Sequence, residues 1–149
     1  IRAKQTDKLM ETLEDLQGKK VVLCGDLNDT PISYTHHQLN KVLKDAYAES
    51  GNGVGVSYNK NRLYVRIDHL FISENLSVYE CQVDNSIAAS DHYPISCYIS
   101  WKEEGILGCK NHVYSLFYAE KDKYFHFTPL DCEKNSIFAT LYKLGNNKK

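Results

Sequence analysis

A short apolar run that ends in acidic and amide side chains constrains this chain more than any other stretch. Val21-Val22-Leu23-Cys24 is followed at once by Gly25, Asp26, Leu27 and Asn28. Such an apolar run, rich in β-branched residues, predicts a strand buried on both faces. If the backbone stays extended, Asp26 and Asn28 lie on the same side of it. The alternative is an ordinary strand-to-turn junction, because Gly, Asp and Asn are common turn residues.

The composition permits one globular domain and excludes several other classes. The chain has 149 residues, of which 42% are hydrophobic and 25% charged. Its net charge of −1 gives no basic field from which nucleic-acid binding could be argued. No segment approaches the roughly 18 apolar residues of a membrane span, and no signal peptide is visible. Because Ile1 already lies inside a helical pattern, we expect a piece of a longer protein, with any targeting segment before Ile1.

The chain contains five cysteines, none of them in Cys-x-x-Cys spacing. Cys24, Cys81 and Cys97 lie inside apolar, strand-like runs, where a thiol behaves as a small hydrophobic group. We therefore expect reduced thiols and, by default, a cytoplasmic location.

Two helices are expected near the start of the chain. Leu9, Leu13 and Leu16 recur at helical spacing and predict an amphipathic helix over residues 2–17. A second, shorter helix is predicted over residues 32–43, with His36 and His37 on its surface. No third ligand is spaced to join these two histidines in a metal site.

A glycine-rich stretch over residues 50–55 precedes Tyr58. It lacks the Lys-Ser/Thr ending and the strand-loop-helix context of a phosphate-binding loop, so we expect a flexible loop on the substrate side. Tyr58 either lies at the mouth of a site or packs as an ordinary tyrosine.

Three strands are predicted over residues 66–73, 76–83 and 93–101, the first two joined by a tight Glu74-Asn75 turn. In a three-stranded meander the first and third strands run the same way, so their starts lie at one edge. That edge carries Asp68 and the pair Asp91-His92. If the strand ending at Asp26 runs in the opposite direction, its end meets them there.

The predicted cluster has the groups that phosphate chemistry requires. Asp68 stands in an apolar strand and needs a partner, for which His92 is the candidate; the alternative is a His–Asp pair that only pins a loop. Asp26 and Asp91 supply hard oxygens suited to Mg²⁺. Asn28 can donate to a phosphate oxygen without adding charge. The set favours metal-assisted attack of water on phosphate.

Three motifs then identify a family resemblance: Gly25-Asp26-Leu27-Asn28-Asp29-Thr30-Pro31, Arg66-Ile67-Asp68-His69-Leu70 and Ser90-Asp91-His92-Tyr93-Pro94. In this order they resemble the back half of the endonuclease/exonuclease/phosphatase superfamily, the deoxyribonuclease I-like fold. That superfamily includes abasic-site endonucleases, deadenylases, sphingomyelinases and inositol phosphatases. The resemblance covers about residues 2–101.

The resemblance implies a Mg²⁺-dependent phosphoester hydrolase, with Mn²⁺ as an alternative metal. It implies that Asp26 orients or deprotonates the attacking water and that Asn28 holds the phosphate. It also implies that Asp68 orients His92, that His92 stabilises charge developing on the phosphate, and that Asp91, with Asp26, helps to hold the metal. The substrate would be a nucleic acid, a phospholipid or a small phosphate ester.

The implied fold is α/β: half of a four-layer sandwich, with a largely antiparallel sheet and two flanking helices. We expect residues 1–101 to form the C-terminal half of such a domain. Family members carry a metal-binding glutamate in a front half, which Glu11 and Glu14 do not match. The missing half is therefore an expected partner, and the isolated chain is expected to have weak activity or none. The alternative is a non-catalytic remnant that acts as a binding module.

Residues 102–149 are expected to form a β-rich C-terminal extension of unknown type. Tyr114–Tyr118 and Tyr124–Phe127, separated by charged residues, predict an aromatic hairpin. Residues 136–144 predict a further strand or a short helix.

Overall fold

The computed structural model describes the backbone of residues 2–60, 62–87, 91–101, 112–119, 124–130 and 138–141, and the side chains of residues 3–60, 62–87 and 91–101. Its elements in chain order are α1 (Arg2–Glu14), β1 (Val21–Asp26), α2 (Tyr34–Leu39), β2 (Lys44–Asp45), α3 (Ala46–Ser50), β3 (Tyr58–Lys60), β4 (Leu63–Val65), β5 (Asp68–Ile72), β6 (Ser77–Val83), β7 (Ile95–Trp101), β8 (His112–Ala119), β9 (Tyr124–Leu130) and β10 (Phe138–Leu141).

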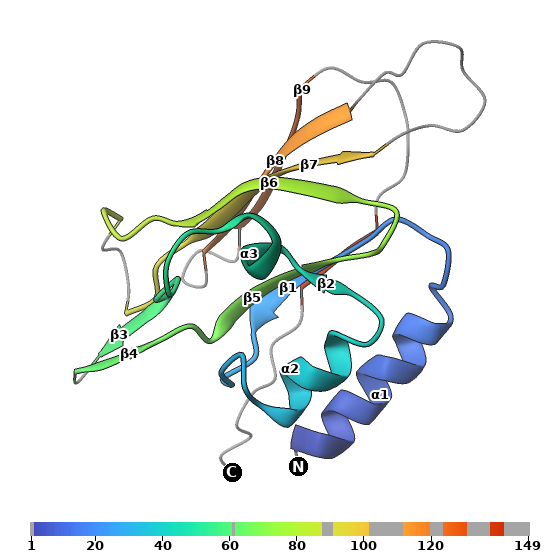
Figure 1. Ribbon diagram of the computed structural model, residues 1–149, viewed down its shortest axis with the longest axis horizontal. Helices are drawn as coiled ribbons and strands as arrows, with labels where there is room; N and C mark the ends of the chain where they lie inside the picture. The colour runs from blue at the N-terminus through green and yellow to red at the C-terminus, as the bar shows by residue number, and fades with distance from the viewer. Residues whose placement is uncertain are drawn as a thin grey trace.

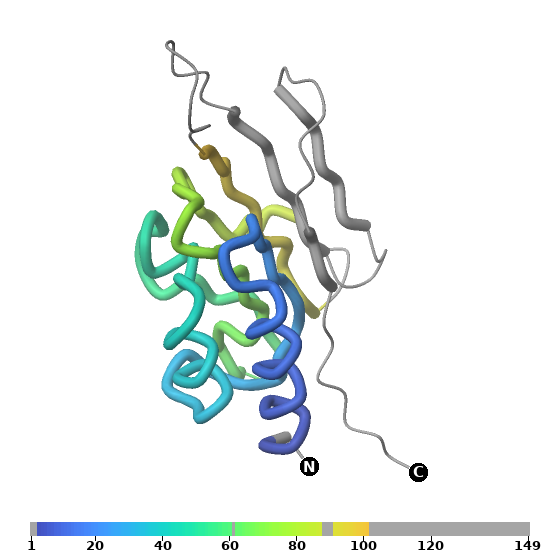
Figure 2. The backbone as a smooth tube through the Cα atoms, turned by 90° about the vertical axis from the view of Figure 1, so that its right-hand side faces the viewer, coloured from blue at the N-terminus to red at the C-terminus, as the bar shows by residue number. Residues whose placement is uncertain are grey.

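These strands form two sheets and a separate hairpin. One sheet has the order β10-β1-β5-β2, the other has the order β6-β7-β8-β9, and β3 pairs with β4 alone. Every pairing is antiparallel except that of β1 with β10. Helices α1 and α2 lie side by side against the first sheet (Figures 1 and 2). The predicted α/β class, with largely antiparallel strands and flanking helices, is confirmed.

The alternating side chains of β1 and β5 divide the core into two parts. Val22, Cys24, Leu70 and Ile72 pack with β6, β7 and α3 in the layer between the sheets. The intervening residues, among them Phe71, pack with α1 and α2 on the opposite face. Both faces of these strands are therefore buried, as the apolar run predicts. In this arrangement, Asp68 and His69 belong to opposite faces of β5.

The predicted three-stranded meander is wrong. β5 pairs with β1 and β2, whereas β6 pairs with β7 in the other sheet. The Ser73–Leu76 turn therefore carries the chain from one sheet to the other. The reason is burial: all of β5 is buried and needs a cover on both faces, whereas most of β6 is partly or fully exposed.

Both helices are shorter than predicted. The first ends at Glu14, with turns up to Gly18, which has φ +80°. The second begins after Ser33, whose side chain accepts a bond from the His36 amide. Ile32 lies outside this helix and is 96% exposed. Within the described residues, no helix is long and apolar enough to cross a membrane.

The three cysteines that the sequence assigns to apolar strands are buried. Cys24, Cys81 and Cys97 lie in the core between the sheets, and all three are free thiols. Burial raises the pKa of Cys24 to about 12, so this thiol stays protonated and unreactive at neutral pH.

The last strands extend both sheets. The aromatic segments form β8 and β9, which pair antiparallel as predicted, and β8 also pairs with β7. Of the two alternatives predicted for residues 136–144, a strand or a short helix, the strand is present as β10, which pairs parallel with β1. Their side chains lie outside the described residues.

Candidate active site

Two carboxylates face each other at one edge of the first sheet. Asp26 ends β1, Asp68 begins β5, and the two are directly opposite in the strand register. They are only 2% and 1% exposed. Like charges directly opposite are destabilising, and a buried charge is costly without a partner. This edge therefore has surplus negative charge that a cation or a proton donor can neutralise.

His92 reaches this pair from the other sheet. It lies just before β7, and its Nδ1 is 2.7 Å from Oδ2 of Asp68. Because an ionised carboxylate only accepts, Nδ1 carries the proton, which leaves Nε2 as the basic nitrogen of the neutral ring. The second oxygen, Asp68 Oδ1, is buried and has no hydrogen-bond partner among the described residues. One ligand atom from each of Asp26, Asp68 and His92 lies within 4.8 Å of the others.

Asn28 joins the cluster through a turn and not through an extended strand, so the expected strand alternation is wrong at this position. Its φ is +49°, a left-handed conformation that asparagine tolerates. The Asn28 amide donates to Asp26 Oδ1 at 2.8 Å, and its side-chain Nδ2 donates to Asp26 Oδ2 at 2.9 Å. The turn thus places the carboxamide directly beside the carboxylate.

Asp91 is not one of the groups that the structure gathers within 4.8 Å. Its Oδ2 forms an ion pair with Lys60 Nζ at 2.9 Å. The hydrogen bond from Lys60 lowers the pKa of Asp91, and the same bond raises the pKa of Lys60. An ammonium group therefore already neutralises this carboxylate.

The start of β3 and the residue before it, Ser57, support both members of the Asp68–His92 pair, a role that the sequence analysis missed. Ser57 Oγ accepts from the amides of Ile67 and Asp68 at 3.1 and 3.0 Å. Tyr58 forms an isolated β-bridge with His92, and the two rings meet edge to face with centroids 4.9 Å apart. The sequence gives little signal for this hairpin, because Asn59 and Lys60 are residue types that strands disfavour.

Comparison with known proteins identifies the chain's family. The model of the family described as Endonuclease/Exonuclease/phosphatase matches residues 11–92, more than half of the sequence. The chain belongs to this family. Membership groups it with phosphoester hydrolases, and the matched range includes Asp26, Asn28, Asp68 and His92. The predicted family resemblance is confirmed.

A solved structure shares the family fold. It is the mannosyl-6-phosphatase of Bacteroides thetaiotaomicron VPI-5482, with 23% sequence identity and a TM-score of 0.53. The match covers 66% of this chain and 45% of that one, so the chain spans less than half of the phosphatase. No curated protein matches the sequence.

A second His–Asp pair lies on the opposite face of the first sheet. The prediction that His36 is a surface residue is wrong: it is 4% exposed, and its Nε2 is 2.8 Å from Asp45 Oδ2. Arg66 Nη1 contacts both Asp45 oxygens, at 3.0 and 2.8 Å. His69 Nδ1 is 3.5 Å from the same Nη1. We call these four residues the Arg66 network.

In the Arg66 network the carboxylate of Asp45 has a cationic partner, in contrast to the facing carboxylates of Asp26 and Asp68. Asp45 also accepts from the amides of Tyr47 and Ala48 at the start of α3. Burial acts to raise its pKa, but the His36 hydrogen bond and the Arg66 charge outweigh burial and lower the pKa to about 2. Ligand atoms of His36, Asp45 and His69 lie within 4.8 Å, a set that could hold a metal. Arg66 already supplies the positive charge there.

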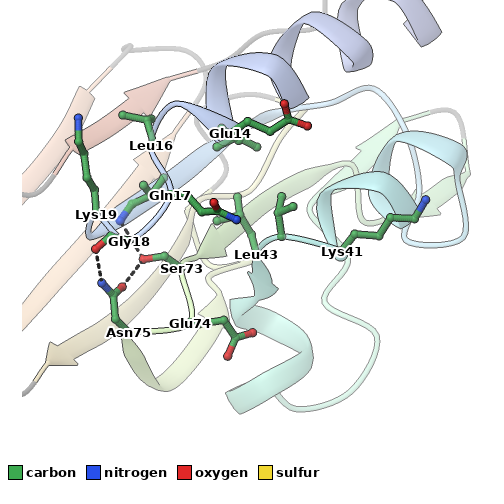
Figure 3. A pocket seen from close by; sticks show the side chains of 13 residues that line it. Glu14, Leu16, Gln17, Gly18, Lys19, Lys41, Leu43, Ser73, Glu74 and Asn75 are labelled. Carbon is green, nitrogen blue, oxygen red and sulfur yellow. Dashed lines mark hydrogen bonds between the residues drawn. The ribbon is translucent and has the colours of Figure 1, made fainter.

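A pocket of about 330 Å³ lies away from the family motifs, at the other end of β1. Leu13, Val21 and Leu43 contribute to its apolar lining, and Figure 3 shows Lys19 and Lys41 on opposite sides of it. Val21 begins β1 and Asp26 ends it, so roughly 17 Å of strand separates the two places. The pocket therefore does not provide the phosphate site.

Proposed function

We propose that this chain carries the water-activating and phosphate-binding groups of a Mg²⁺-dependent phosphoester hydrolase. The observation that carries the proposal is the Asp68–His92 hydrogen bond, formed opposite Asp26 in a member of the endonuclease/exonuclease/phosphatase family. Buried carboxylates with surplus charge, beside a hydrogen-bonded imidazole, suit general-base activation of water.

Asp26 is the proposed base. Its carboxylate accepts two bonds from Asn28, which hold it in one orientation while it orients a water and takes its proton. Asn28 Nδ2 donates to an oxygen of the phosphate. Because a carboxamide carries no charge, it can approach the anionic phosphate without repulsion.

His92 is the proposed stabiliser of charge on the phosphate. Asp68 fixes the ring through Nδ1, so that Nε2, once it carries a proton, points at the phosphate and can donate to its oxygen as negative charge develops. The Tyr58 ring restricts the rotation of this imidazole by packing against its edge.

The residues present fit a hard divalent cation in part. Facing carboxylates and the buried Asp68 Oδ1, which has no hydrogen-bond partner among the described residues, are oxygen donors of the kind that Mg²⁺ prefers. We propose that Asp26 and Asp91 help to hold Mg²⁺, or Mn²⁺ in its place, with Asp91 released from Lys60. The metal, when bound, neutralises charge on the phosphate. Residues supplied from a front half of the fold would complete its coordination.

The proposed substrate is a phosphoester: a nucleic acid, a phospholipid or a small phosphate ester. The structural neighbour is a mannosyl-6-phosphatase, so a sugar phosphate is one of the small phosphate esters to test.

Hydrolysis of bis-p-nitrophenyl phosphate and of mannose 6-phosphate with Mg²⁺ tests the proposal. The assay compares the chain with a version extended in front of Ile1. Each length is tested as the wild type, as Asp68→Asn and as His37→Gln, a control that changes an exposed histidine. We expect faster hydrolysis by the longer chain, loss of activity in Asp68→Asn and no change in His37→Gln. Equal turnover by both lengths would contradict the incomplete metal site. Absence of hydrolysis by both would favour a non-catalytic binding module.

A further inference from the structure

The Arg66 network determines which nitrogen of His69 carries the proton. Arg66 Nη1 lies 3.5 Å from His69 Nδ1. A guanidinium group has donors and no acceptor, so its approach favours an unprotonated Nδ1, and the closer contact of Nε2 with the Asp29 carbonyl, at 2.8 Å, requires a proton on Nε2. The ring proton is therefore on Nε2. Asp45 fixes the guanidinium in turn, through two contacts of 2.8 and 3.0 Å to Arg66 Nη1.

The protonated nitrogen points at the turn that follows β1. His69 Nε2 lies 2.8 Å from the carbonyl oxygen of Asp29, which can only accept. His69 is 1% exposed, so water does not compete for this donor. The bond joins β5 to a segment 40 residues earlier in the chain.

This turn needs such support. Asn28 has a positive φ of 49°, and its two bonds to Asp26 are local to the turn. A residue in this region persists only where its surroundings hold it. The Leu27 amide donates a hydrogen bond to the carbonyl of Ile67, just before β5, at 3.0 Å, and the His69 bond ties the next part of the turn to β5 itself. Asn28 lies between these two attachments.

We propose that His69 is a positioning residue: its Nε2–H bond to the Asp29 carbonyl, with the tautomer set by Arg66 and Asp45, holds Asn28 where it can bind a phosphoryl oxygen. The ordering of the turn stands on the structure, and its importance for phosphate rests on the proposed function. The face of β5 that packs against α1 and α2 thus controls the geometry of the candidate site on the opposite face.

Nuclear magnetic resonance of the ¹⁵N-labelled full chain tests this proposal. Long-range ¹H–¹⁵N spectra report the His69 tautomer, and amide exchange at Asn28 reports the order of the turn. His69→Phe keeps a ring and removes the donor, His69→Gln restores a donor, and Phe71→Leu is the packing control. Phe71 packs on the same histidine, with ring centroids 5.9 Å apart, and takes no part in the bond.

We expect the Nε2–H tautomer in the wild-type chain. We expect about tenfold faster Asn28 amide exchange in His69→Phe, at least partial recovery in His69→Gln and no change in Phe71→Leu. Binding of inorganic phosphate should weaken several-fold in His69→Phe alone. Observation of the Nδ1–H tautomer would overturn the proposal, and so would equal effects of His69→Phe and Phe71→Leu on Asn28 exchange. If His69→Phe does not fold, the tautomer of the wild-type chain and the Asn28 exchange rate in His69→Gln provide the test. Absent phosphate binding in every chain, with the exchange pattern intact, would overturn the phosphate-binding role of Asn28 in this chain and leave the positioning role of His69.

Discussion

The molecule contains two buried His–Asp pairs with opposite chemical characters. His36–Asp45 is surrounded by donors: Arg66 and the amides at the start of α3 saturate the carboxylate. His92–Asp68 has a second carboxylate opposite it and an oxygen without a hydrogen-bond partner among the described residues. A pair of the first kind holds structure together, whereas surplus charge gives the second kind the capacity to bind a cation or a substrate. The surroundings of a residue pair thus decide its role more than the pair itself.

If the two pairs differ as described, removing the histidine of the His92–Asp68 pair should affect activity most strongly. We expect His92→Gln to lower turnover of a hydrolysing form of the protein by about a thousandfold, because the phosphate loses its imidazole donor. Steady-state kinetics with bis-p-nitrophenyl phosphate measure the loss. His37→Gln, which changes an exposed histidine on α2, should leave the rate unchanged; a loss of less than tenfold in His92→Gln would contradict the assigned role.

The same isosteric change in the two aspartates should separate their contributions to stability. Asp45→Asn leaves the buried Arg66 without its counter-ion, and we expect the free energy of unfolding to fall by about 3 kcal/mol. Asp68→Asn removes one of two facing carboxylates and should change it by less than about 1 kcal/mol. Urea denaturation of both variants checks the contrast. Equal losses would show that both pairs are structural.

The pH dependence of stability gives a further test of the buried face. The pKa of His69 is lowered to about 4, mainly by burial. The hydrogen bond to the Asp29 carbonyl acts to raise this pKa, and the charge of Arg66 acts to lower it. Between pH 6.5 and 4 the unfolded chain therefore binds a proton that the folded chain does not. Stability is complete above this window and falls as the pH falls through it, by about 3 kcal/mol.

Thermal melts of the wild type and of His69→Phe between pH 7 and 4 measure this contribution, and the variant should show a flatter profile. Asp45 does not interfere, because its folded pKa of about 2 places its own loss of stability below pH 4. An unchanged profile in His69→Phe would show that another group titrates in this window.

The smallest expected effect concerns Asp91. Lys60→Met removes the ammonium that competes with a metal for this carboxylate, so we expect Mn²⁺ to bind about two- to threefold more tightly, since exposed ion pairs contribute little. Electron paramagnetic resonance of free Mn²⁺ measures the affinity. Lys41→Met makes the same charge change away from Asp91 and serves as the control. Weaker binding in Lys60→Met would exclude competition.

The convergence of Asp26, Asp68 and His92 could be predicted from the sequence because each acid ends or begins an apolar run. The route was wrong, because β5 and β6 belong to different sheets. These side chains nevertheless lie together, because β1 and β5 run in opposite directions, as predicted. Alternation along a strand identifies its faces but not its neighbours.

The Arg66 network could not be predicted in the same way. His36 lies among polar residues on a short helix, which favours a surface position. Its burial depends on Asp45 and on Arg66, which lies 21 residues beyond Asp45. A charged group becomes a core residue only when its partners are assembled, and their assembly is a property of the fold. The support of Asp68 by Ser57 is hidden for the same reason.

Asp68 and His69 are adjacent on β5 and serve opposite faces of the sheet. Inserting or deleting one residue near this strand would exchange the two side chains, placing an imidazole beside Asp26 and a carboxylate beneath the turn. The Asp68–His92 hydrogen bond and the His69 bond to the turn would then be lost together. We therefore expect insertions and deletions in related sequences to avoid residues 66–72 and to fall in the loops at either end.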